Sequence, residues 1–302
     1  MSHELGWTQV QAAFPYTVFI FCYALLMVIA GGMYDRFGPR LLIGTGSIFI
    51  GLAFILSTFF LTPYGVAIIW GILVGIGVAC CYAAATPAAI KWFPATMKGL
   101  VTGIVVFGMG FSAVVMAPAA NLLVEQGIKK AFLYAGLIIF AGLFLLAQVV
   151  KNPPQISTPT GFSPEKERRT LILRHPQFYR LWVMFCFTTG VGITFVTHLT
   201  RIVDIETGFE KGYIMVALFA FFNAVGRLAA GWLSDRVGRD KAMTMVFGAM
   251  ALALLYVLFV RSPAAMGLAI SVLGMTYGGL YSLFPAATVS YFGEEDFGLN
   301  FG

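Results

Sequence analysis

The chain consists of long apolar stretches separated by short polar ones, and the long stretches contain no Asp, Glu, Lys or Arg. A helix needs about 20 apolar residues to cross a hydrocarbon core about 30 Å thick. None of the stretches alternates apolar and polar residues as the strands of a membrane barrel do. The Pro/Gly turn at residues 61–65 divides the longest stretch into two helices. The pattern predicts nine membrane-spanning helices, near residues 13–34, 41–60, 65–90, 99–122, 131–150, 179–200, 212–234, 242–260 and 264–288.

The composition indicates an all-α membrane protein in contact with the lipid bilayer. Of the 302 residues, 59% are hydrophobic and 11% are charged, whereas an average soluble chain has about 25% charged residues. The N-terminal sequence MSHELGWTQ lacks the features of a cleavable signal peptide. The cysteines do not have the spacing of metal ligands, so we expect them to be buried apolar side chains and expect no metal site: Cys22, Cys80, Cys81 and Cys186.

The net charge of +6 comes mainly from loops on one side of the membrane, which the positive-inside rule makes cytoplasmic. This placement accounts for the basic excess and argues against a nucleic-acid partner. The cytoplasmic side receives Arg36, Arg40, Lys91, Lys98, Lys151, Lys166, Arg168, Arg169, Arg174, Arg180, Arg236, Arg239 and Lys241. The other side receives Lys129, Lys130, Arg201, Lys211 and Arg261.

The longest polar segment divides the chain into two bundles. Its second part offers Ser163 as a helix N-cap, followed by Pro164, and predicts a short basic amphipathic helix on the cytoplasmic surface. The sequence therefore predicts an N-terminal bundle of five spans over 1–150, a cytoplasmic central loop over 151–178 and a C-terminal bundle of four spans over 179–302.

The two bundles are repeats of each other. GGMYDRFGPR (31–40) and GWLSDRVGRD (231–240) match at an offset of 200 through Gly31/Gly231, Asp35/Asp235, Arg36/Arg236 and Gly38/Gly238. A second region matches at an offset of 199, through Tyr82/Tyr281, Phe93/Phe292, Gly99/Gly298 and Gly103/Gly302. Both copies of G-x-x-x-D-R-x-G fall on the cytoplasmic side, so the bundles are parallel repeats about an axis along the membrane normal.

A duplicated G-x-x-x-D-R-x-G on either side of a basic loop resembles the major facilitator superfamily. GWTQ before the first span, DRFGPR, NAVGR and YFG…FGLNFG resemble its oxalate/formate antiporter-like group, which is related to monocarboxylate transporters. The resemblance implies a fold of two pseudo-symmetric helical bundles. It also implies a monomeric, non-enzymatic carrier of small carboxylates in the plasma or inner membrane, without a cofactor. Family members have twelve spans, so by this alignment family helices 1, 11 and 12 are absent and the chain is expected to be a fragment.

The two D-R-x-G loops are candidates for a gate. Asp235 is expected to face the N-terminus of the helix that starts near Lys98 and Gly99, where the helix dipole favours a negative charge. The resemblance implies a cytoplasmic latch that opens during transport, whereas a simpler alternative is that the motif only ends each helix at the interface. The latch candidates are Gly31, Asp35, Arg36, Gly38 and Arg40 with Gly231, Asp235, Arg236 and Gly238.

Arg227 is the candidate for binding substrate, because it lies in the middle of an apolar span, about 12 Å from Asp235 along the helix. An arginine there costs about 2.5–3.5 kcal/mol on insertion scales, so it is expected to face a watery cavity or a fixed anion. Its planar guanidinium suits a carboxylate. The alternatives are that Arg227 extends to the cytoplasmic interface or forms a structural ion pair.

Further candidates for the substrate site are Tyr277 and Tyr281, which share one helix face, with Tyr82 as the repeat mate of Tyr281. Tyr23 and Asn223 lie on the equivalent helices of the two halves. Proton-coupled monocarboxylate carriers commonly have an Asp where this chain has Asn223, which favours anion exchange over proton symport. A non-transporting, receptor-like or inactive truncated protein is an alternative of another class.

The segment GMGFSA resembles half of a dinucleotide fingerprint, but it lies within a membrane helix and follows no strand, so it does not predict nucleotide binding. Gly103, Gly108 and Gly110 are instead expected to let neighbouring helices approach closely. The sequence contains no Ser/His/Asp or Cys/His set and no Walker loop, and it gives little support to an enzyme.

Overall fold

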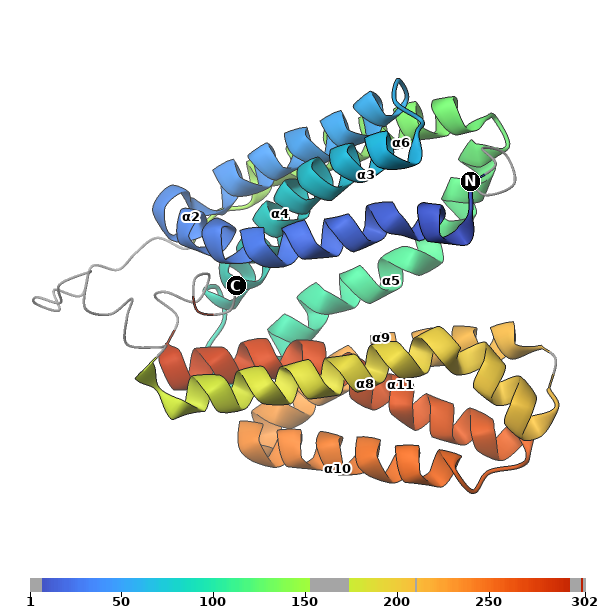
Figure 1. Cartoon of the computed structure of the whole chain (residues 1–302). Helices are drawn as coiled ribbons and strands as arrows, with labels where there is room; N and C mark the ends of the chain where they lie inside the picture. Colours follow the sequence, from blue (N-terminus) through green and yellow to red (C-terminus); the bar gives the residue numbers. More distant parts are fainter. Residues whose placement is uncertain (1–6, 153–173, 210, 294–299, 301–302) are drawn as a thin grey trace, which may run out of the picture. The chain divides into compact units, whose positions relative to one another are not determined.

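A computed structural model describes residues 7–152, 174–209, 211–293 and 300 (Figure 1). The described residues form helices and contain no strand. The predicted amphipathic helix in the central loop falls largely outside the described residues. The elements are α2 (Gln9–Ser57), α3 (Pro63–Ile69), the π-helix η1 (Trp70–Val74), α4 (Gly75–Ile90), the 3₁₀ turn η2 (Ala95–Met97), α5 (Lys98–Val124), α6 (Ile128–Val149), α8 (Pro176–Thr207), α9 (Gly212–Val237), α10 (Arg239–Val257) and α11 (Pro263–Phe292).

The predicted spans fall on these helices, and the all-α membrane fold is confirmed. The kinked helix α2 contains the first two spans, and α3, η1 and α4 together form the third. The remaining six spans correspond one to one to α5, α6, α8, α9, α10 and α11. Within the described parts of the chain, 7 helices are long and apolar enough to cross a membrane, with α2 counted once.

The chain divides into two compact units. The first contains the described residues within Met1–Trp92, Ala113–Gln155 and Gly293–Gly302, and the second those within Phe93–Ser112 and Ile156–Phe292. The first part of α5 therefore belongs to the second unit, where it contacts α9, although the sequence groups its span with the N-terminal bundle. The boundaries predicted at residues 150 and 179 stay predictions.

The D-R-x-G loops turn at equivalent glycines. Gly38 interrupts α2 with φ 76° and ψ 174°, and Gly238 separates α9 from α10 with φ 89° and ψ 153°. Residues with a Cβ rarely adopt such positive φ angles, so glycine permits the sharp change of direction after each Asp-Arg pair. The matching angles indicate that the motif has glycine at this position because the turn requires a positive φ.

Equivalent helices begin in the same way in the two units. Thr62 accepts a hydrogen bond from the amide of Gly65 at 3.1 Å, and Ser262 accepts one from Ala265 at 3.4 Å. Each capping residue is followed by proline, which is favoured at the first helical position because it has no amide to leave unpaired. α11 then runs through the centre of the second unit, where Leu273, Leu280 and Leu283 are buried.

Candidate functional site

Helices α9 and α11 approach each other closely enough for direct main-chain contact. A Cβ on Gly226 would lie 1.9 Å from the carbonyl oxygen of Met275, and a Cβ on Gly278 would lie 1.9 Å from that of Asn223. No other residue type fits at either position without moving a helix. This close crossing brings the polar side chains of α9 beside the tyrosines of α11.

Arg227 lies buried between α9, α11 and α5, with 8% of its surface exposed. Its Nη1 donates a hydrogen bond to the carbonyl oxygen of Val106, and its Cζ lies 5.1 Å from the centre of the Tyr281 ring. A cation above an aromatic ring at this distance is stabilised by the negative face of the ring. In the described structure, the guanidinium therefore lies against α5 and α11 within the second unit.

Two glycines of α5 make room for Arg227. A Cβ on Gly110 would lie 3.2 Å from Cζ of Arg227, and a Cβ on Gly103 would lie 2.5 Å from its carbonyl oxygen. Gly108, which lies between them in the sequence, has no atom within 4 Å of its Cβ position. Two of the three glycines expected to permit close helix approach thus do so, and both meet Arg227.

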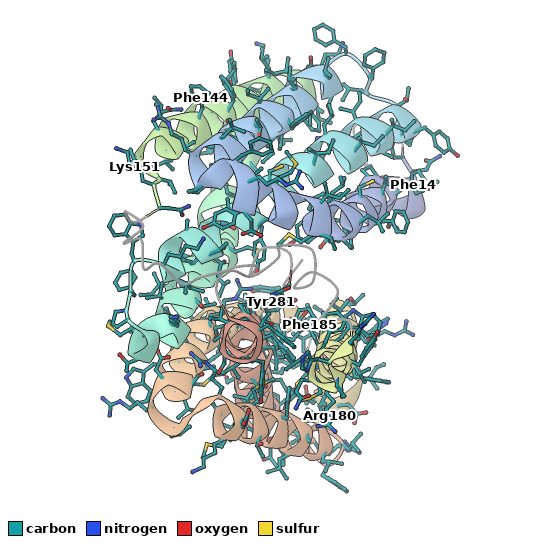
Figure 2. All side chains as sticks on the ribbon, turned by 90° about the vertical axis from the view of Figure 1, so that its left-hand side faces the viewer. Phe14, Phe144, Lys151, Arg180, Phe185 and Tyr281 are labelled. Atoms are coloured by element: carbon teal, nitrogen blue, oxygen red, sulfur yellow. The ribbon has the colours of Figure 1, made fainter. Side chains whose placement is uncertain are left out.

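The tyrosines form a hydrogen-bonded pair beside Arg227. The hydroxyls of Tyr277 and Tyr281 lie 3.0 Å apart. Figure 2 shows Phe185 and Tyr281 side by side, with an edge contact between rings whose centres are 6.2 Å apart. A Cβ on Gly192 of α8 would lie 2.1 Å from the Tyr277 ring, so this glycine determines how far the ring can move. Together these contacts hold Tyr281 against the guanidinium of Arg227 and Tyr277 against Tyr281.

The predicted substrate residues separate into two groups. Asn223, buried one helical turn before Arg227, belongs with Arg227, Tyr277 and Tyr281 in the second unit. Tyr23 and Tyr82 belong to the first unit, where their rings meet edge to face with centres 6.3 Å apart. The repeat mates Tyr82 and Tyr281 therefore both stand against the helix that precedes a D-R-x-G loop.

The carboxylate of Asp235 caps α5. Its Oδ1 accepts a hydrogen bond from the amide of Gly99 and its Oδ2 one from Leu100, both at 2.8 Å. The first four amides of a helix have no partner within it and carry partial positive charge, so this carboxylate satisfies two of them. The contact between Asp235 and the start of α5 is the one expected from the repeats.

Gly231 explains the rest of the spacing in G-x-x-x-D. A Cβ on Gly231 would lie 2.3 Å from the carbonyl oxygen of Gly99, and a Cβ on Gly99 would lie 2.4 Å from that of Gly231. Residues four apart share one helix face. The glycine therefore lets α5 and α9 touch, and the aspartate one turn later reaches the exposed amides.

The other latch candidates have varied surroundings. Arg236 lies over the ring of Trp232, with Cζ 4.5 Å from its centre. Nε of Arg40 donates to Gln148 of α6 at 2.9 Å, and the side chain of Arg36 is exposed. Near Asp35, burial lowers the pKa of Lys91, while the negative charge of Asp35 acts in the opposite direction. Gly31 is buried within α2.

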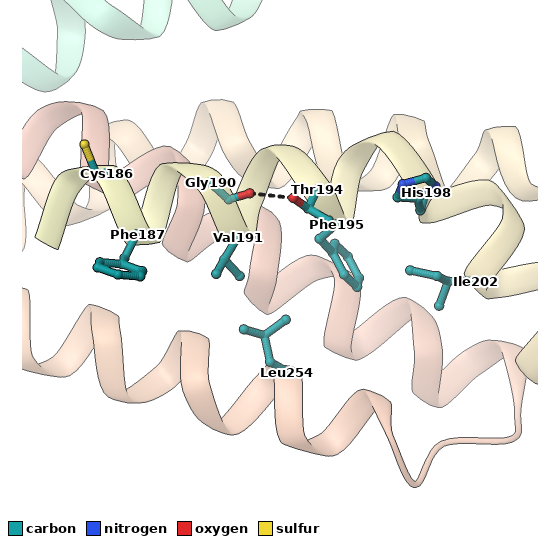
Figure 3. Close-up of a pocket in the computed structure, with 9 residues that line it drawn as sticks. All are labelled: Cys186, Phe187, Gly190, Val191, Thr194, Phe195, His198, Ile202 and Leu254. Carbon is teal, nitrogen blue, oxygen red and sulfur yellow. Dashed lines mark hydrogen bonds between the residues drawn. The ribbon is translucent and has the colours of Figure 1, made fainter. Parts of the chain in front are cut away.

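One groove lies on α8, and Arg227 is not among the residues that line it. It has a volume of about 630 Å³ and is lined by α8 residues, including Phe187, Val191 and His198, with Leu254 of α10 (Figure 3). Thr194 donates its hydroxyl proton to the carbonyl of Gly190 in the same helix, at 2.8 Å. The lining is mainly apolar, and the lining residues include no Lys or Arg. Within the described part of the chain, no group of His, Cys, Asp and Glu could hold a metal ion.

Sequence reasoning missed two members of the Arg227 site. Val106 contributes only its main-chain carbonyl, which gives no signal in the sequence. Gly192 is a single glycine in an apolar helix, where glycine has many uses. Both follow from the packing of α5 and α8 and could not be found from residue type.

Comparison with known proteins gives consistent matches. A family model described as Major Facilitator Superfamily matches residues 1–302. The oxalate:formate antiporter of Oxalobacter formigenes is 30% identical over 291 residues, which cover 90% of this chain and 66% of that protein. Monocarboxylate transporter 13 of Bos taurus is 24% identical, covering 83% of this chain and 58% of that protein. The chain thus spans about two thirds of the length of these relatives or somewhat less.

Solved structures show the same fold. The transporter FucP in its outward conformation superposes with a TM-score of 0.75 at 18% identity, covering 98% of this chain and 80% of that one. The proton:xylose symporter XylE superposes with a TM-score of 0.69 at 13% identity, covering 96% of this chain and 75% of that one. At these identities the likeness concerns the fold alone.

Proposed function

Because this chain belongs to the Major Facilitator Superfamily, a family of non-enzymatic membrane transporters, we propose that it serves the transport of small mono- or dicarboxylates by anion exchange. The superfamily fold supports alternating access, in which two bundles expose one site to each side of the membrane in turn. One relative, the oxalate:formate antiporter, is named for two such carboxylates.

The observation that carries the proposal is the burial of Arg227 between three helices. Placing a guanidinium in the middle of a membrane protein has a considerable free-energy cost, and such residues commonly mark substrate pathways. The repeat mate of Arg227, at an offset of 200, is Met27, which is 6% exposed where Arg227 is 8% exposed. The same position in the other half is thus occupied by an apolar side chain, so packing alone does not require a charge.

The chemistry around Arg227 suits a carboxylate. A guanidinium can donate two parallel hydrogen bonds to one carboxylate, and the neighbouring phenols of Tyr277 and Tyr281 add donors without adding charge. Asn223, one turn away, can donate or accept but cannot release a proton at physiological pH. We therefore assign Arg227 to anion binding, Tyr277, Tyr281 and Asn223 to completing the site, and Tyr82 and Tyr23 to its counterpart in the first unit.

Other parts of the proposal follow from the charge pattern and the caps. Asp235 of α9, which caps the start of α5, acts with Asp35 in the equivalent motif as a latch that opens during transport. The positive-inside rule, applied to the basic loops, supports a cytoplasmic central segment in a plasma or inner membrane. The protein functions as a monomer.

The test of the site compares Arg227→Met with Arg227→Lys, using oxalate as the probe. Met is the residue that the other repeat carries at this position, so the variant should fold with a melting temperature in detergent no lower than that of the unaltered protein. It should lose the rise in melting temperature that oxalate causes. Lys keeps the charge but loses the planar fork, so the affinity for oxalate should fall about tenfold or more. An unchanged response to oxalate in Arg227→Met would exclude Arg227 from the site.

The mode of coupling is tested by uptake of labelled oxalate into vesicles. Exchange requires that the vesicles be preloaded with formate or oxalate, and an imposed pH gradient should not drive uptake into empty vesicles. Strong uptake driven by the gradient would favour proton symport, the alternative suggested by the likeness to a monocarboxylate transporter.

A further inference from the structure

The first repeat contains one residue more than the second between two matched positions. Pro63 and Pro263 begin equivalent helices at an offset of 200, whereas Tyr82 and Tyr281 match at an offset of 199. The twenty residues 63–82 of the first repeat thus correspond to the nineteen residues 263–281 of the second. One residue has been inserted, or lost from the other half, within this helix.

Burial narrows the position of the extra residue. The buried pair Val66 and Ala67 corresponds at an offset of 200 to the buried pair Met266 and Gly267. Further on, the offset between buried pairs is 199, since Val74 and Gly75 correspond to Leu273 and Gly274. The change of offset therefore occurs between residues 67 and 74.

The π-helix η1, Trp70–Val74, lies in this interval. The equivalent part of α11 belongs to one uninterrupted α-helix, Pro263–Phe292. A π turn closes its hydrogen bond over five residues where an α turn uses four, so it can hold one additional residue. Without it, an extra residue would rotate everything beyond it by about 100° about the helix axis. η1 thus keeps both flanking segments in register.

Contacts on either side of η1 agree with this explanation. A Cβ on Gly75 would lie 3.3 Å from the amide nitrogen of Tyr23, and a Cβ on Gly274 would lie 3.3 Å from that of Asn223. Tyr23 and Asn223 are themselves repeat mates. Gly71, within η1, lies against Val18, whose Cγ1 would be 2.2 Å from an added Cβ. The π turn thus lies where α2 and the helix formed by α3, η1 and α4 are in close contact.

Within η1, consecutive residues face different neighbours. Trp70 packs against Phe54, with ring centres 4.9 Å apart, and against Phe132 of α6, at 6.1 Å. Gly71 faces the first half of α2 instead. Beyond η1, Tyr82 reaches Tyr23 of that same half. η1 therefore lets Trp70 pack against α6 while Tyr82 keeps its place beside Tyr23.

We propose that η1 is a one-residue insertion that positions Tyr82 at the place that Tyr281 occupies in the other half. η1 is thus a positioning element of the candidate anion site and does not itself bind substrate. The proposal rests on the proposed function only for the role of Tyr82, since the register can be tested without any substrate.

The test uses single-residue deletions in a chain whose native cysteines are replaced by Ala. Deletion of Ile72, an exposed residue of η1, should convert the segment into a continuous α-helix. Tyr23→Cys and Tyr82→Cys should then still be joined by a short bifunctional thiol reagent. Deletion of Ser271, the equivalent residue of α11, removes a residue from a helix with no π turn. It should abolish the crosslink between Asn223→Cys and Tyr281→Cys, the matched pair in the second unit.

A converse variant tests the same register by insertion. One Ala inserted after Ser271 should be absorbed as a new π turn, and the crosslink between Asn223→Cys and Tyr281→Cys should persist. The proposal is overturned if deletion of Ile72 prevents folding or abolishes its crosslink, or if deletion of Ser271 leaves its crosslink intact. Loss of the second crosslink in the insertion variant would also count against it.

Oxalate separates this inference from the proposed function. If the deletion of Ile72 keeps the crosslink in the variant with Tyr23→Cys and Tyr82→Cys, and keeps the oxalate-induced rise in melting temperature in a chain that retains both tyrosines, both proposals hold. If the crosslink persists but oxalate has no effect even on the parent protein, the register is supported and the carboxylate assignment fails. If the parent protein responds to oxalate but the deletion of Ile72 abolishes the crosslink, only the positioning role of η1 is refuted.

Discussion

Asp235→Asn removes one of the two acceptors that cap α5, and its effect can be worked out from the contacts. The carboxylate accepts from Gly99 and Leu100 at 2.8 Å each, whereas an amide side chain has one acceptor oxygen and presents an NH₂ group to the second donor. A hydrogen bond to a charged group contributes about 1.5–3 kcal/mol. The first turn of α5 should be destabilised by about that amount, with a smaller loss from the helix dipole.

The expected consequence is faster hydrogen exchange at the start of α5. Since 1.4 kcal/mol corresponds to a tenfold change in an equilibrium constant, the amides of Gly99 and Leu100 should exchange about 10- to 150-fold faster. Peptide-level hydrogen–deuterium exchange in detergent measures this directly. Peptides from the buried centre of α11 should be unaffected, which distinguishes local opening from global unfolding.

Asp35→Asn is the matched control, because it makes the same change in the other copy of the motif. It should leave the exchange of Gly99 and Leu100 unaltered. The argument is refuted if Asp235→Asn exchanges these amides at the rate of the unaltered protein, or if both variants accelerate them equally. In the first case the carboxylate does not hold the helix end, and in the second the effect is not local.

Three further predictions concern packing and surface charge. Gly278→Ala should destabilise by about 1–3 kcal/mol or more because its Cβ would lie 1.9 Å from the carbonyl of Asn223, whereas Gly108→Ala, with open space around it, should be neutral or slightly stabilising in thermal unfolding. Gly192→Ala should displace the Tyr277 ring and weaken oxalate binding in a thermal-shift titration, and Gly190→Ala, which meets nothing within 4 Å, should not. Arg261→Ala breaks an ion pair with Glu206 at 2.6 Å, but 65% of the arginine side chain is exposed. The free energy of unfolding should therefore fall by no more than about 1 kcal/mol, with a correspondingly small change in melting temperature. A larger loss of stability would show that this pair holds α8 to the loop before α11.

The helices could be predicted because an uncharged stretch of about 20 residues has few folded alternatives in a membrane. The position of Asp235 could also be predicted, since the repeat fixed which helix end it faces. The partner of Arg227 could not, because Val106 acts through its main chain. The turn within α2 could be predicted as well, because Gly38 and Pro39 indicate it, and the non-helical angles of Gly38 separate the two spans there.

The π turn illustrates a different limit. The change of offset from 200 to 199 is visible in the sequence, but an apolar residue added to an apolar helix has no local signature of its own. Only the burial of Val74 and Gly75, together with the geometry of η1, shows where the extra residue is accommodated. Sequence alone is compatible with a longer loop, which would require no π turn and would leave Gly71 free of Val18.

Matched and unmatched residues of the two repeats carry different information about this chain. Gly38 and Gly238 share a positive φ angle, and Gly75 and Gly274 share a close approach to the helix before their D-R-x-G loop, at Tyr23 and at Asn223, so identity across the repeats marks positions that the backbone requires. Met27 and Arg227 are equally buried but chemically opposite, so the difference marks a position where packing leaves the side chain free to acquire a function. Tyr82 and Tyr281 combine the two cases, since the residue is the same while its neighbour is Tyr23 in one unit and Arg227 in the other. A duplicated framework can therefore carry an asymmetric anion site through changes confined to the side chains that face the tyrosines.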